Sequence, residues 1–261
     1  MPLENFAFVL FKPKSPGNLG AAARALKNMG FRDLRIVAPA ASELFRQTPL
    51  YHNAEPLAVH GRDVLAAARI HADLGSALTD RTLVVGTTAR TGLYRSEVQA
   101  IRESSNELAG LSTANRIAMV FGPEDCGLTN QEIKLCQRLV TVPTAPEYPS
   151  LNLAQAVMIV AYELMLAAGA ARELPSAQPR ASIPELEAML ARLANALVAI
   201  GFLPEDNPDH IMFALRAILG RSGLNPRELD ILNGIVSQIL WVAEGGNETL
   251  AAKHRAGKKL R

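Results

Sequence analysis

Short apolar runs alternate with helical patterns along the first two thirds of the chain. Five of these runs are rich in branched or aromatic side chains, as expected of buried strands. They are residues 6–11, 34–38, 82–85, 117–121 and 140–142. A helical pattern can be placed between most pairs of them. Strands separated by helices pair in parallel, so the pattern predicts a doubly wound α/β domain that ends near Arg172.

The first strand leads into a break and then a helix. Residues 12–17 contain two prolines and a glycine, which end the strand. Asn18 is a candidate N-cap for an alanine-rich helix that runs to Met29, and Gly30 is the expected stop. Arg24 lies about a turn beyond the helix start. It is either a solvated helix arginine or a group that faces a ligand at the end of the first strand.

The stretch 139–172 has the least ordinary pattern. Three prolines, Pro143, Pro146 and Pro149, follow the last strand within seven residues and predict a stiff loop. Ser150 and Asn152 then stand just before an apolar run and are candidate caps for its helix. A stiff loop that runs into a helix N-terminus suits a polar ligand, because backbone donors face outward there. It also suits a plain rigid connection.

The apolar run 153–168 is predicted to be a buried core helix rather than a membrane span. A span needs about 20 predominantly apolar residues, whereas Gln155 and Glu163 interrupt this run and both flanks are polar.

The last third of the chain predicts a helical appendage. Residues 173–182 form a polar, proline-containing linker. Helices are expected at about 184–200, 209–220 and 226–243, within an extension spanning 183–252. Residues 173–252 carry 5 basic and 10 acidic side chains, whereas the tail 253–261 carries 5 basic ones. The predicted domains are therefore 1–172, the linker, 183–252 and a basic tail, which is either solvated or adds phosphate contacts.

Composition narrows the class of protein. The chain has 261 residues, 49% of them hydrophobic, and a net charge of +2, with a pI near 8.6. This charge is too mild to indicate a nucleic-acid binder by itself. Cys126 and Cys136 form no CxxC pair, and the histidines lack metal-ligand spacing, so no disulfide framework or metal site is expected. The N-terminus has no secretory signature, and a cytoplasmic protein is the default expectation.

Two glycine patterns resemble nucleotide-binding loops and fail on particular residues. Gly17 and Gly20 do not make a GxGxxG, and no acidic residue ends the second strand. Gly122 and Gly127 have P-loop spacing, but Leu128 stands where the lysine is needed. We therefore reject nucleotide hydrolysis. Past this loop, the spacing of Thr129 and Glu132 predicts a capping box for a short helix through Cys136.

Several polar or glycine-rich positions fall at the carboxyl ends of the predicted strands, where open α/β sheets bind ligands. They are Arg24, Thr87 and Thr88, Gly122 to Glu124, and Ser150 to Asn152. Thr87 and Thr88 are equally typical of an ordinary turn, and Glu124 and Asp125 of solvated loop acids. Their convergence at one edge is stronger than any one of these signals and predicts a ligand site.

Three motifs in order resemble the signature motifs of the SPOUT methyltransferases. They are Asn18-x-Gly20-x-x-x-Arg24, Phe121-Gly122-Pro123-Glu124-x-x-Gly127-Leu128, and Pro143 with Ser150-Leu151-Asn152-Leu153. The segment PEYPSLNLAQAV and the helical extension resemble, more narrowly, TrmJ-type tRNA 2′-O-methyltransferases. The resemblance covers nearly the whole chain. It implies a sheet tied in a trefoil knot, a homodimer, and S-adenosylmethionine bound in the knot.

The resemblance also implies roles for particular residues. Arg24, from the other subunit, would meet the ribose that is methylated, with Ser150 as a catalytic helper, and Asn18, Glu124 and Asn152 would contact the substrate. The implied cofactor-binding residues are Thr87, Thr88, Ala89, Gly122, Val142, Pro149, Ser150 and Leu151. Pro149 stands where the family often has a small polar residue, so a backbone contact survives there and a side-chain hydrogen bond does not.

The implied reaction is S-adenosylmethionine-dependent methylation of a ribose 2′-hydroxyl, which requires RNA. The narrower resemblance points to tRNA as the substrate, methylated at nucleotide 32, which opens the 5′ side of the anticodon loop. It implies neither a metal cofactor nor association with a membrane. Because arginine has a pKa above about 12, Arg24 is expected to orient the nucleotide and stabilise the developing alkoxide; general base is the other possibility. The alternatives are a ribosomal RNA enzyme of the same fold, a non-catalytic RNA-binding relative, and a small-molecule enzyme.

Overall fold

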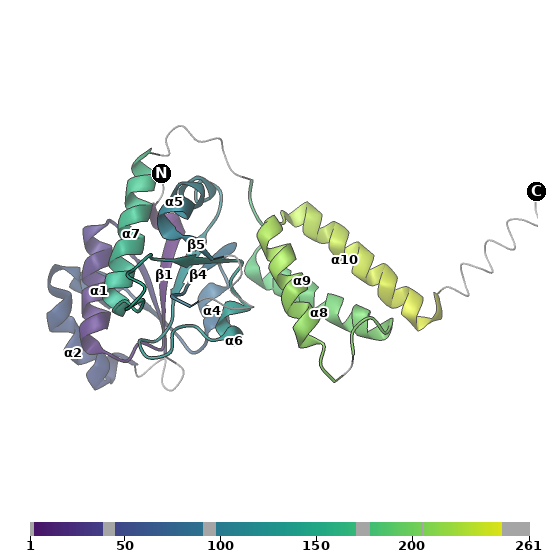
Figure 1. The fold of residues 1–261 in the computed structure, drawn as a ribbon, viewed down its shortest axis with the longest axis horizontal. Helices are drawn as coiled ribbons and strands as arrows, with labels where there is room; N and C mark the ends of the chain where they lie inside the picture. Colours follow the sequence, from purple (N-terminus) through teal and green to yellow (C-terminus); the bar gives the residue numbers. More distant parts are fainter. Residues whose placement is uncertain (1–2, 39–44, 91–97, 171–177, 205, 247–261) are drawn as a thin grey trace, which may run out of the picture. The chain divides into compact units, whose positions relative to one another are not determined.

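The computed structural model describes residues 3–38, 45–90, 98–170, 178–204 and 206–246. The chain divides into two compact units, Met1–Ile183 and Pro184–Arg261, and each is described by itself (Figure 1).

A parallel sheet forms the centre of the first unit. Within the described residues it has seven strands in the order β3-β2-β1-β6-β4-β7-β5. Every neighbouring pair is parallel, with Phe8, for example, opposite Leu34 on one side and Met119 on the other. The strands are β1 (Phe6–Phe11), β2 (Asp33–Val37), β3 (Arg69–His71), β4 (Leu83–Thr87), β5 (Val98–Ala100), β6 (Ile117–Phe121) and β7 (Arg138–Thr141). The predicted parallel α/β architecture is confirmed.

The five predicted strands are all present, and two strands were missed. β3 and β5 have three residues each and form the two edges of the sheet. Three residues are too few to show a periodicity of two, and edge strands are not fully buried, so neither leaves an apolar run. The polar pattern of residues 96–108 predicts a helix over the whole stretch, and this prediction is wrong at its start: Val98–Ala100 is strand and the helix begins at Ile101, while residues 96 and 97 lie outside the described residues.

Helices pack on the strands and on one another. They are α1 (Pro16–Asn28), α2 (Pro49–Ala58), α3 (Arg62–Ala66), α4 (Leu74–Leu78), α5 (Ile101–Leu111), α6 (Asn130–Ile133) and α7 (Leu153–Ala170), with short 3₁₀ turns at Leu3–Asn5, Phe45–Gln47 and Val59–Gly61. α7 packs between α1 and α5, and α2 packs on α1. Figure 1 shows α4 and α6 on the other side of the strands.

The start of α1 differs from the prediction. Ser15, not Asn18, is the N-cap: its hydroxyl accepts a hydrogen bond from the backbone N–H of Asn18 at 3.4 Å, and Pro16 takes the first helical position. Proline fits there because its missing N–H would have no partner in the first turn. Asn18 therefore lies within the first turn, which leaves its side chain available for other contacts. The helix ends at Asn28 with Met29 as its C-cap, and Gly30, the predicted stop, follows with a φ of +80°.

Gly20 is required by helix packing. A Cβ atom built on it would lie 2.3 Å from the carbonyl oxygen of Ala54 and 2.9 Å from the backbone nitrogen of Ala58, both on α2. These are backbone atoms and cannot rotate away. The glycine of the first motif thus permits the close approach of α1 and α2.

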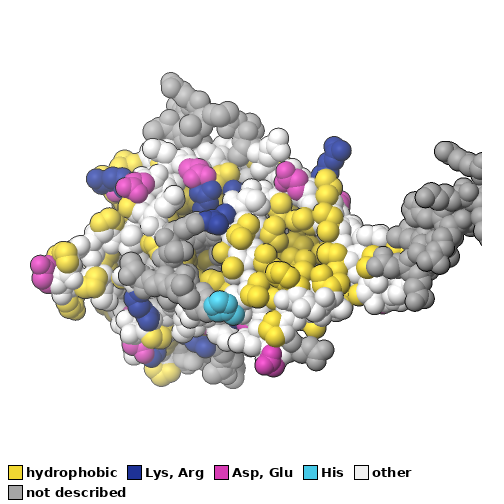
Figure 2. Space-filling view, turned by 45° about the vertical axis from the view of Figure 1, so that its right-hand side comes forward, with side chains coloured by type: hydrophobic (Ala, Val, Ile, Leu, Met, Phe, Trp, Pro, Cys, Tyr) yellow, Lys and Arg dark blue, Asp and Glu magenta, His cyan; other side chains and the backbone are white. Residues whose placement is uncertain are grey.

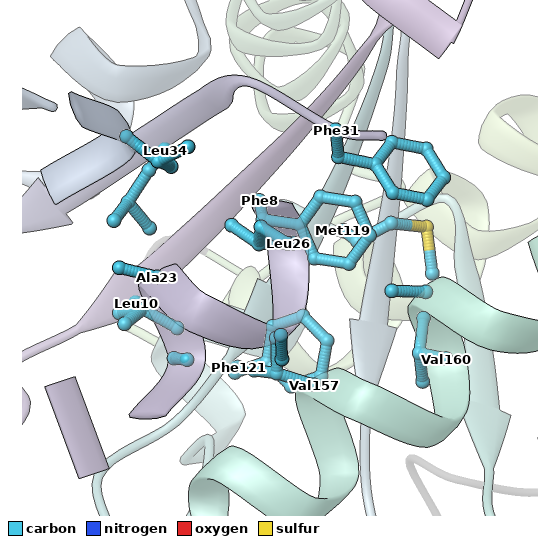
Figure 3. Close-up of a cluster of buried hydrophobic side chains, with 14 of the residues drawn as sticks. Phe8, Leu10, Ala23, Leu26, Phe31, Leu34, Met119, Phe121, Val157 and Val160 are labelled. Atoms are coloured by element: carbon cyan, nitrogen blue, oxygen red, sulfur yellow. The ribbon is translucent and has the colours of Figure 1, made fainter. Parts of the chain in front are cut away.

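The core lies between the sheet and the α1–α7 layer. Phe8 on β1 contacts Phe31 with ring centroids 4.9 Å apart and stacks on Phe121 of β6 at 6.0 Å. Met119 and the α7 residue Val157 are fully buried in the same cluster (Figure 3). Burial of this many aromatic and branched side chains holds α7 against the strand ends that carry the second motif.

α7 is the buried core helix that the sequence predicts. Its one acidic side chain beyond the first turns, Glu163, is 8% exposed and accepts hydrogen bonds from Arg102 of α5 at 2.8 and 3.0 Å. A buried carboxylate needs such a partner. Among the residues that the structure describes, no helix has the length and apolar character to cross a membrane.

Within its described residues the second unit contains three helices, as predicted: α8 (Ile183–Ala199), α9 (Asp209–Ser222) and α10 (Pro226–Trp241), followed by a π-helical turn, η6 (Val242–Gly246). Asn225 and Glu228 form the capping box of α10. Large apolar side chains stay exposed on this unit: Ile200, Phe202, Ile218, Ile231, Ile235 and Trp241. Figure 2 shows hydrophobic side chains gathered over one continuous area of the face turned to the viewer.

Candidate functional site

The loops that follow β4, β6 and β7 enclose a cavity of about 400 Å³ with the start of α7. Its lining comprises Thr87, Thr88, Ala89, Arg90, Phe121, Gly122, Pro123, Glu124, Asp125, Cys126, Gly127, Leu128, Val140, Thr141, Val142, Pro149, Ser150, Leu151, Leu153, Ala156 and Val160. These loops meet because parallel strands present their carboxyl ends at the same edge.

All eight residues that the resemblance assigns to the cofactor line this cavity, as does Glu124. They come from three separate stretches of sequence, 87–89, 122 and 142–151, that the fold brings together. Their contact with a cofactor stays a prediction, but their convergence on one cavity is an observed property of the fold.

The second motif forms a tight loop at the mouth of the cavity. A Cβ on Gly122 would lie 2.2 Å from the carbonyl carbon of Gly127 and 2.3 Å from the nitrogen of Leu128. Gly127 adopts a φ of +58°, and its N–H donates to the carbonyl of Pro123 at 2.8 Å. Both glycines are needed because one meets backbone too closely for any side chain and the other is left-handed. The loop therefore folds back on itself, and residues 121–128 together line the cavity.

Thr87 and Thr88 hold the β4 end of the cavity in place. The Thr87 hydroxyl donates to the carbonyl of Val120 at 3.0 Å. The Thr88 N–H donates to the carbonyl of Val140 at 3.0 Å, and its hydroxyl accepts from the N–H of Arg90 at 3.1 Å. The two threonines thus connect β4 to both neighbouring strands, and Thr88 also stabilises the turn that follows.

Sequence reasoning missed the apolar wall of the cavity. Leu153, Ala156 and Val160 of α7 line it, at the i, i+3, i+7 spacing of one helix face. The signal was present in the sequence, but the whole run is apolar, so periodicity alone does not distinguish the face toward the cavity from the face toward the core.

A chain of hydrogen bonds joins the three motifs. The Glu124 carboxylate accepts from the Asn18 side-chain amide at 2.9 Å. The Asn18 side-chain carbonyl accepts from the Asn152 amide at 2.6 Å. Asn152 in turn caps the start of α7, because its side-chain carbonyl accepts from the N–H of Ala154 at 2.9 Å. The three residues predicted to contact the substrate therefore contact one another, which gives them a positioning role; their direct contact with RNA stays a prediction.

Glu124 also anchors the loop before α1. Its two carboxylate oxygens accept the backbone N–H groups of Ser15 and Lys14, each at 3.0 Å. Burial by itself raises the pKa of this carboxyl, but the hydrogen bonds from Asn18 and the backbone outweigh it and hold the pKa below its ordinary value. Glu124 is thus a charged acceptor that fixes the first motif against the second.

The two predicted catalytic residues lie in different places. Ser150 is exposed and lines the cavity. Arg24 is exposed on α1 and is not part of the cavity lining. The hydrogen bonds and ion pairs among the described residues do not engage its guanidinium. One chain therefore brings Ser150, but not Arg24, to the cavity.

The described residues contain no group of three or more histidine, cysteine, aspartate or glutamate side chains placed to hold a metal ion. The cavity is instead lined by apolar side chains, by hydroxyl groups and by the charged side chains of Arg90, Glu124 and Asp125. Such a lining suits an organic ligand with polar groups at one end.

The fold and this cavity define a class. The model of the SpoU rRNA Methylase family matches residues 5–162, which include every strand of the sheet and all the lining of the cavity. The chain therefore belongs to the SpoU methylase family, within the SPOUT fold, and is an RNA 2′-O-methyltransferase.

The second unit narrows the assignment. The model of the tRNA methyltransferase TrmJ C-terminal domain matches residues 184–249. The chain is 36% identical to the tRNA (cytidine/uridine/adenosine-2′-O-)-methyltransferase TrmJ of Pseudomonas aeruginosa (strain UCBPP-PA14), over 93% of this chain and 96% of that protein. It is 35% identical to the tRNA (cytidine/uridine-2′-O-)-methyltransferase TrmJ of Escherichia coli O6:K15:H31, covering 91% and 96%. The crystal structure of TrmJ from Z. mobilis ZM4 superposes with a TM-score of 0.74 at 33% identity, covering 89% and 98%. The chain is thus a member of the TrmJ group of this family.

Proposed function

We propose that this protein methylates the ribose 2′-hydroxyl of nucleotide 32 in tRNA, a cytidine or uridine, with S-adenosylmethionine as the methyl donor. The observation that carries the proposal is the combination of two features in one chain. Residues of the second and third motifs line one cavity and the first motif is hydrogen-bonded to both, while the helical unit matches the TrmJ C-terminal domain. The TrmJ relatives, named for tRNA 2′-O-methylation, match over more than nine tenths of both chains.

The cavity fits S-adenosylmethionine. Its volume of about 400 Å³ is within the range of small-molecule sites, about 300–1,000 Å³. Leu128, Leu153 and Val160 supply an apolar wall for a nucleoside base, and Thr88 and Ser150 in the same lining supply polar groups for the rest of the ligand. When bound, S-adenosylmethionine supplies a methyl group on a sulfonium that a hydroxyl oxygen can attack in one displacement.

The strand order supports the proposed trefoil knot. β7 lies between β4 and β5 in the sheet, so the last strand of the sheet is inserted between two strands that precede it in the chain. The chain leaving β7 contributes residues 142 and 149–151 to the cavity and continues into α7, which packs between α1 and α5. Threading of this segment through the β4–β5 connection is what a knot here requires.

A homodimer completes the proposed active site. Arg24 does not line the cavity of its own chain, and α7 exposes Tyr162 and Leu166 although its other described apolar residues are buried or partly buried. In the proposed dimer Arg24 reaches the cavity of the partner, orients the ribose and stabilises the negative charge that develops on the 2′-oxygen. Ser150 assists by hydrogen bonding at the same oxygen. The tRNA substrate places the protein in the cytoplasm.

Methyl incorporation into unmodified tRNA transcripts from radiolabelled S-adenosylmethionine, with identification of the product nucleoside, tests this function. The expected product is 2′-O-methylcytidine or 2′-O-methyluridine at nucleotide 32. Incorporation into ribosomal RNA only, with the cofactor bound, would assign the enzyme to the ribosomal alternative instead.

We expect Arg24→Ala to leave S-adenosylmethionine affinity nearly unchanged and to lower methyl transfer by orders of magnitude. The reason is that the guanidinium acts on the ribose and lies outside the cofactor cavity of its own chain. Calorimetric titration of the cofactor and single-turnover transfer rates measure the two quantities. An equal loss of both would contradict this role.

Mixed dimers test whether the site is shared between subunits. Gly122→Ala is expected to disable the cavity without touching Arg24. Dimers that pair one Arg24→Ala chain with one Gly122→Ala chain regain activity only if the intact cavity of the first receives Arg24 from the second. Inactive mixed dimers, with both parent variants dimeric, would place Arg24 and the cavity of one chain in the same site.

A further inference from the structure

We infer that Tyr148 is a stacking platform for a base of the RNA, at or next to the nucleotide that is methylated. This inference rests on the proposed function and adds a substrate-contacting residue to it. Tyr148 is 78% exposed, the most exposed of the large hydrophobic side chains in the described part of the chain.

The backbone presents this ring in a fixed place. Tyr148 lies between Pro146 and Pro149, whose rings fix φ. Its N–H donates to the carbonyl of Ala145 at 3.1 Å, which closes a turn. A side chain held out by a stiff turn loses little conformational entropy when a ligand binds. This segment therefore holds the aromatic ring in place before a ligand binds, whereas a flexible loop would lose conformational entropy on binding.

The position of Tyr148 relates it to the reacting atoms. Pro149 and Ser150, the next two residues, line the cavity. Since consecutive Cα atoms are about 3.8 Å apart, the Cα atoms of Tyr148 and Ser150 lie at most about 7.6 Å from each other. Tyr148 therefore lies next to residues of the cavity lining, close to where a ribose presented to the methyl donor carries its base and its neighbours.

An exposed aromatic ring at such a site can stack on an unpaired base of the RNA. Proteins that recognise single-stranded loops of RNA splay bases out and stack them on aromatic side chains. The adjacent carboxylate of Glu147, also exposed, disfavours a phosphate contact at this point, whereas it does not oppose contact with the face of a base. Tyr148 therefore fits a base better than the RNA backbone.

Stacking also agrees with base tolerance among relatives. Every base has a π face, so stacking does not depend on base identity. The relative from Pseudomonas aeruginosa is named for activity on cytidine, uridine and adenosine. A ring that holds any base lets one site act on several nucleotides.

The test compares variants of the full-length dimer on an anticodon stem-loop RNA. Tyr148→Ala is expected to raise KM for the RNA by about 5- to 160-fold, the range for removal of one base–aromatic stack, with cofactor affinity unchanged. Tyr148→Phe is expected to retain wild-type KM, whereas Tyr148→Leu, which keeps apolar bulk without a ring, resembles alanine. Glu147→Gln is the matched control for disturbance of the loop, and its KM is not expected to rise.

Abasic substrates identify the partner of the ring. RNAs that lack the base at the methylated position, or at either neighbour, are each assayed with the wild type and Tyr148→Ala. One of these substrates is expected to remove the difference in KM between the two proteins, because the ring has lost its partner. A difference that persists in all three substrates, or a Tyr148→Ala enzyme with wild-type KM, would overturn the inference. Failure of the wild type to methylate the intact stem-loop would count against the proposed function instead.

Discussion

Replacement of Glu124 by alanine removes the acceptor that holds the first motif to the second. The wild-type carboxylate accepts three hydrogen bonds, from the N–H groups of Lys14 and Ser15 and from the amide of Asn18. Hydrogen bonds to charged groups contribute about 1.5–3 kcal/mol each when buried. Because Glu124 is half-buried and water can replace part of the contact, we take about 1 kcal/mol each. The expected loss of unfolding free energy is about 3 kcal/mol.

Urea unfolding followed by circular dichroism measures this loss, and its pH dependence tests the cause. The folded pKa of Glu124 lies below its ordinary value of 4.5. The ionised carboxylate therefore stabilises the fold fully above that ordinary value, and the contribution is lost as the pH falls through the lowered folded pKa. The difference in unfolding free energy between the wild type and Glu124→Ala is thus expected to be constant near neutral pH and to shrink in acid.

Two variants separate the network from charge alone. Glu124→Gln keeps one acceptor oxygen but turns an N–H₂ group toward hydrogen-bond donors. We therefore expect it to lower the unfolding free energy, but by less than Glu124→Ala does. Asp125→Ala removes an exposed ion pair with Lys14, and we expect little change in stability because water screens such a pair. If Asp125→Ala destabilised as strongly as Glu124→Ala, or if the Glu124→Ala difference did not change with pH, the reasoning would be refuted.

The remaining predictions concern the cavity. Gly122→Ala is expected to weaken S-adenosylmethionine binding more than tenfold in calorimetric titration, because the added Cβ would meet backbone at 2.2 Å. The matched control is Gly169→Ala on α7, where the added Cβ would meet open space. This control is expected to raise the unfolding free energy by up to about 1 kcal/mol. Unchanged cofactor affinity in Gly122→Ala would contradict the geometry. Thiol labelling at pH 7.5 is expected to modify the exposed Cys126 and to spare Cys136, whose burial raises its pKa to about 12. Bound S-adenosylmethionine is expected to slow the labelling of Cys126, which lines the cavity; equal labelling with and without the cofactor would place the ligand elsewhere.

Local pattern was enough for most of the elements. The strand 117–121 and the capping box of Thr129 and Glu132 appear as predicted, although the short helix ends at Ile133 rather than Cys136. These features depend on neighbours within a few residues, which the sequence displays directly. The glycines of the first two motifs could also be recognised, but only through the resemblance to a family. The sequence does not show which backbone atoms pack against a glycine.

The partners of those residues were decided by tertiary structure. The sequence places Asn18 near a helix start, but Ser15 takes the cap, and the Asn18 side chain instead joins Glu124 to Asn152, over more than a hundred residues of chain. The edge strands β3 and β5 likewise exist only because β2 and β7 offer them backbone partners. Interactions between residues far apart in sequence leave no local periodicity, because what stabilises them is the neighbour that the fold supplies. The sequence alone determined most of the elements and the class of the protein; the fold determined the edge strands and which of the polar groups meet.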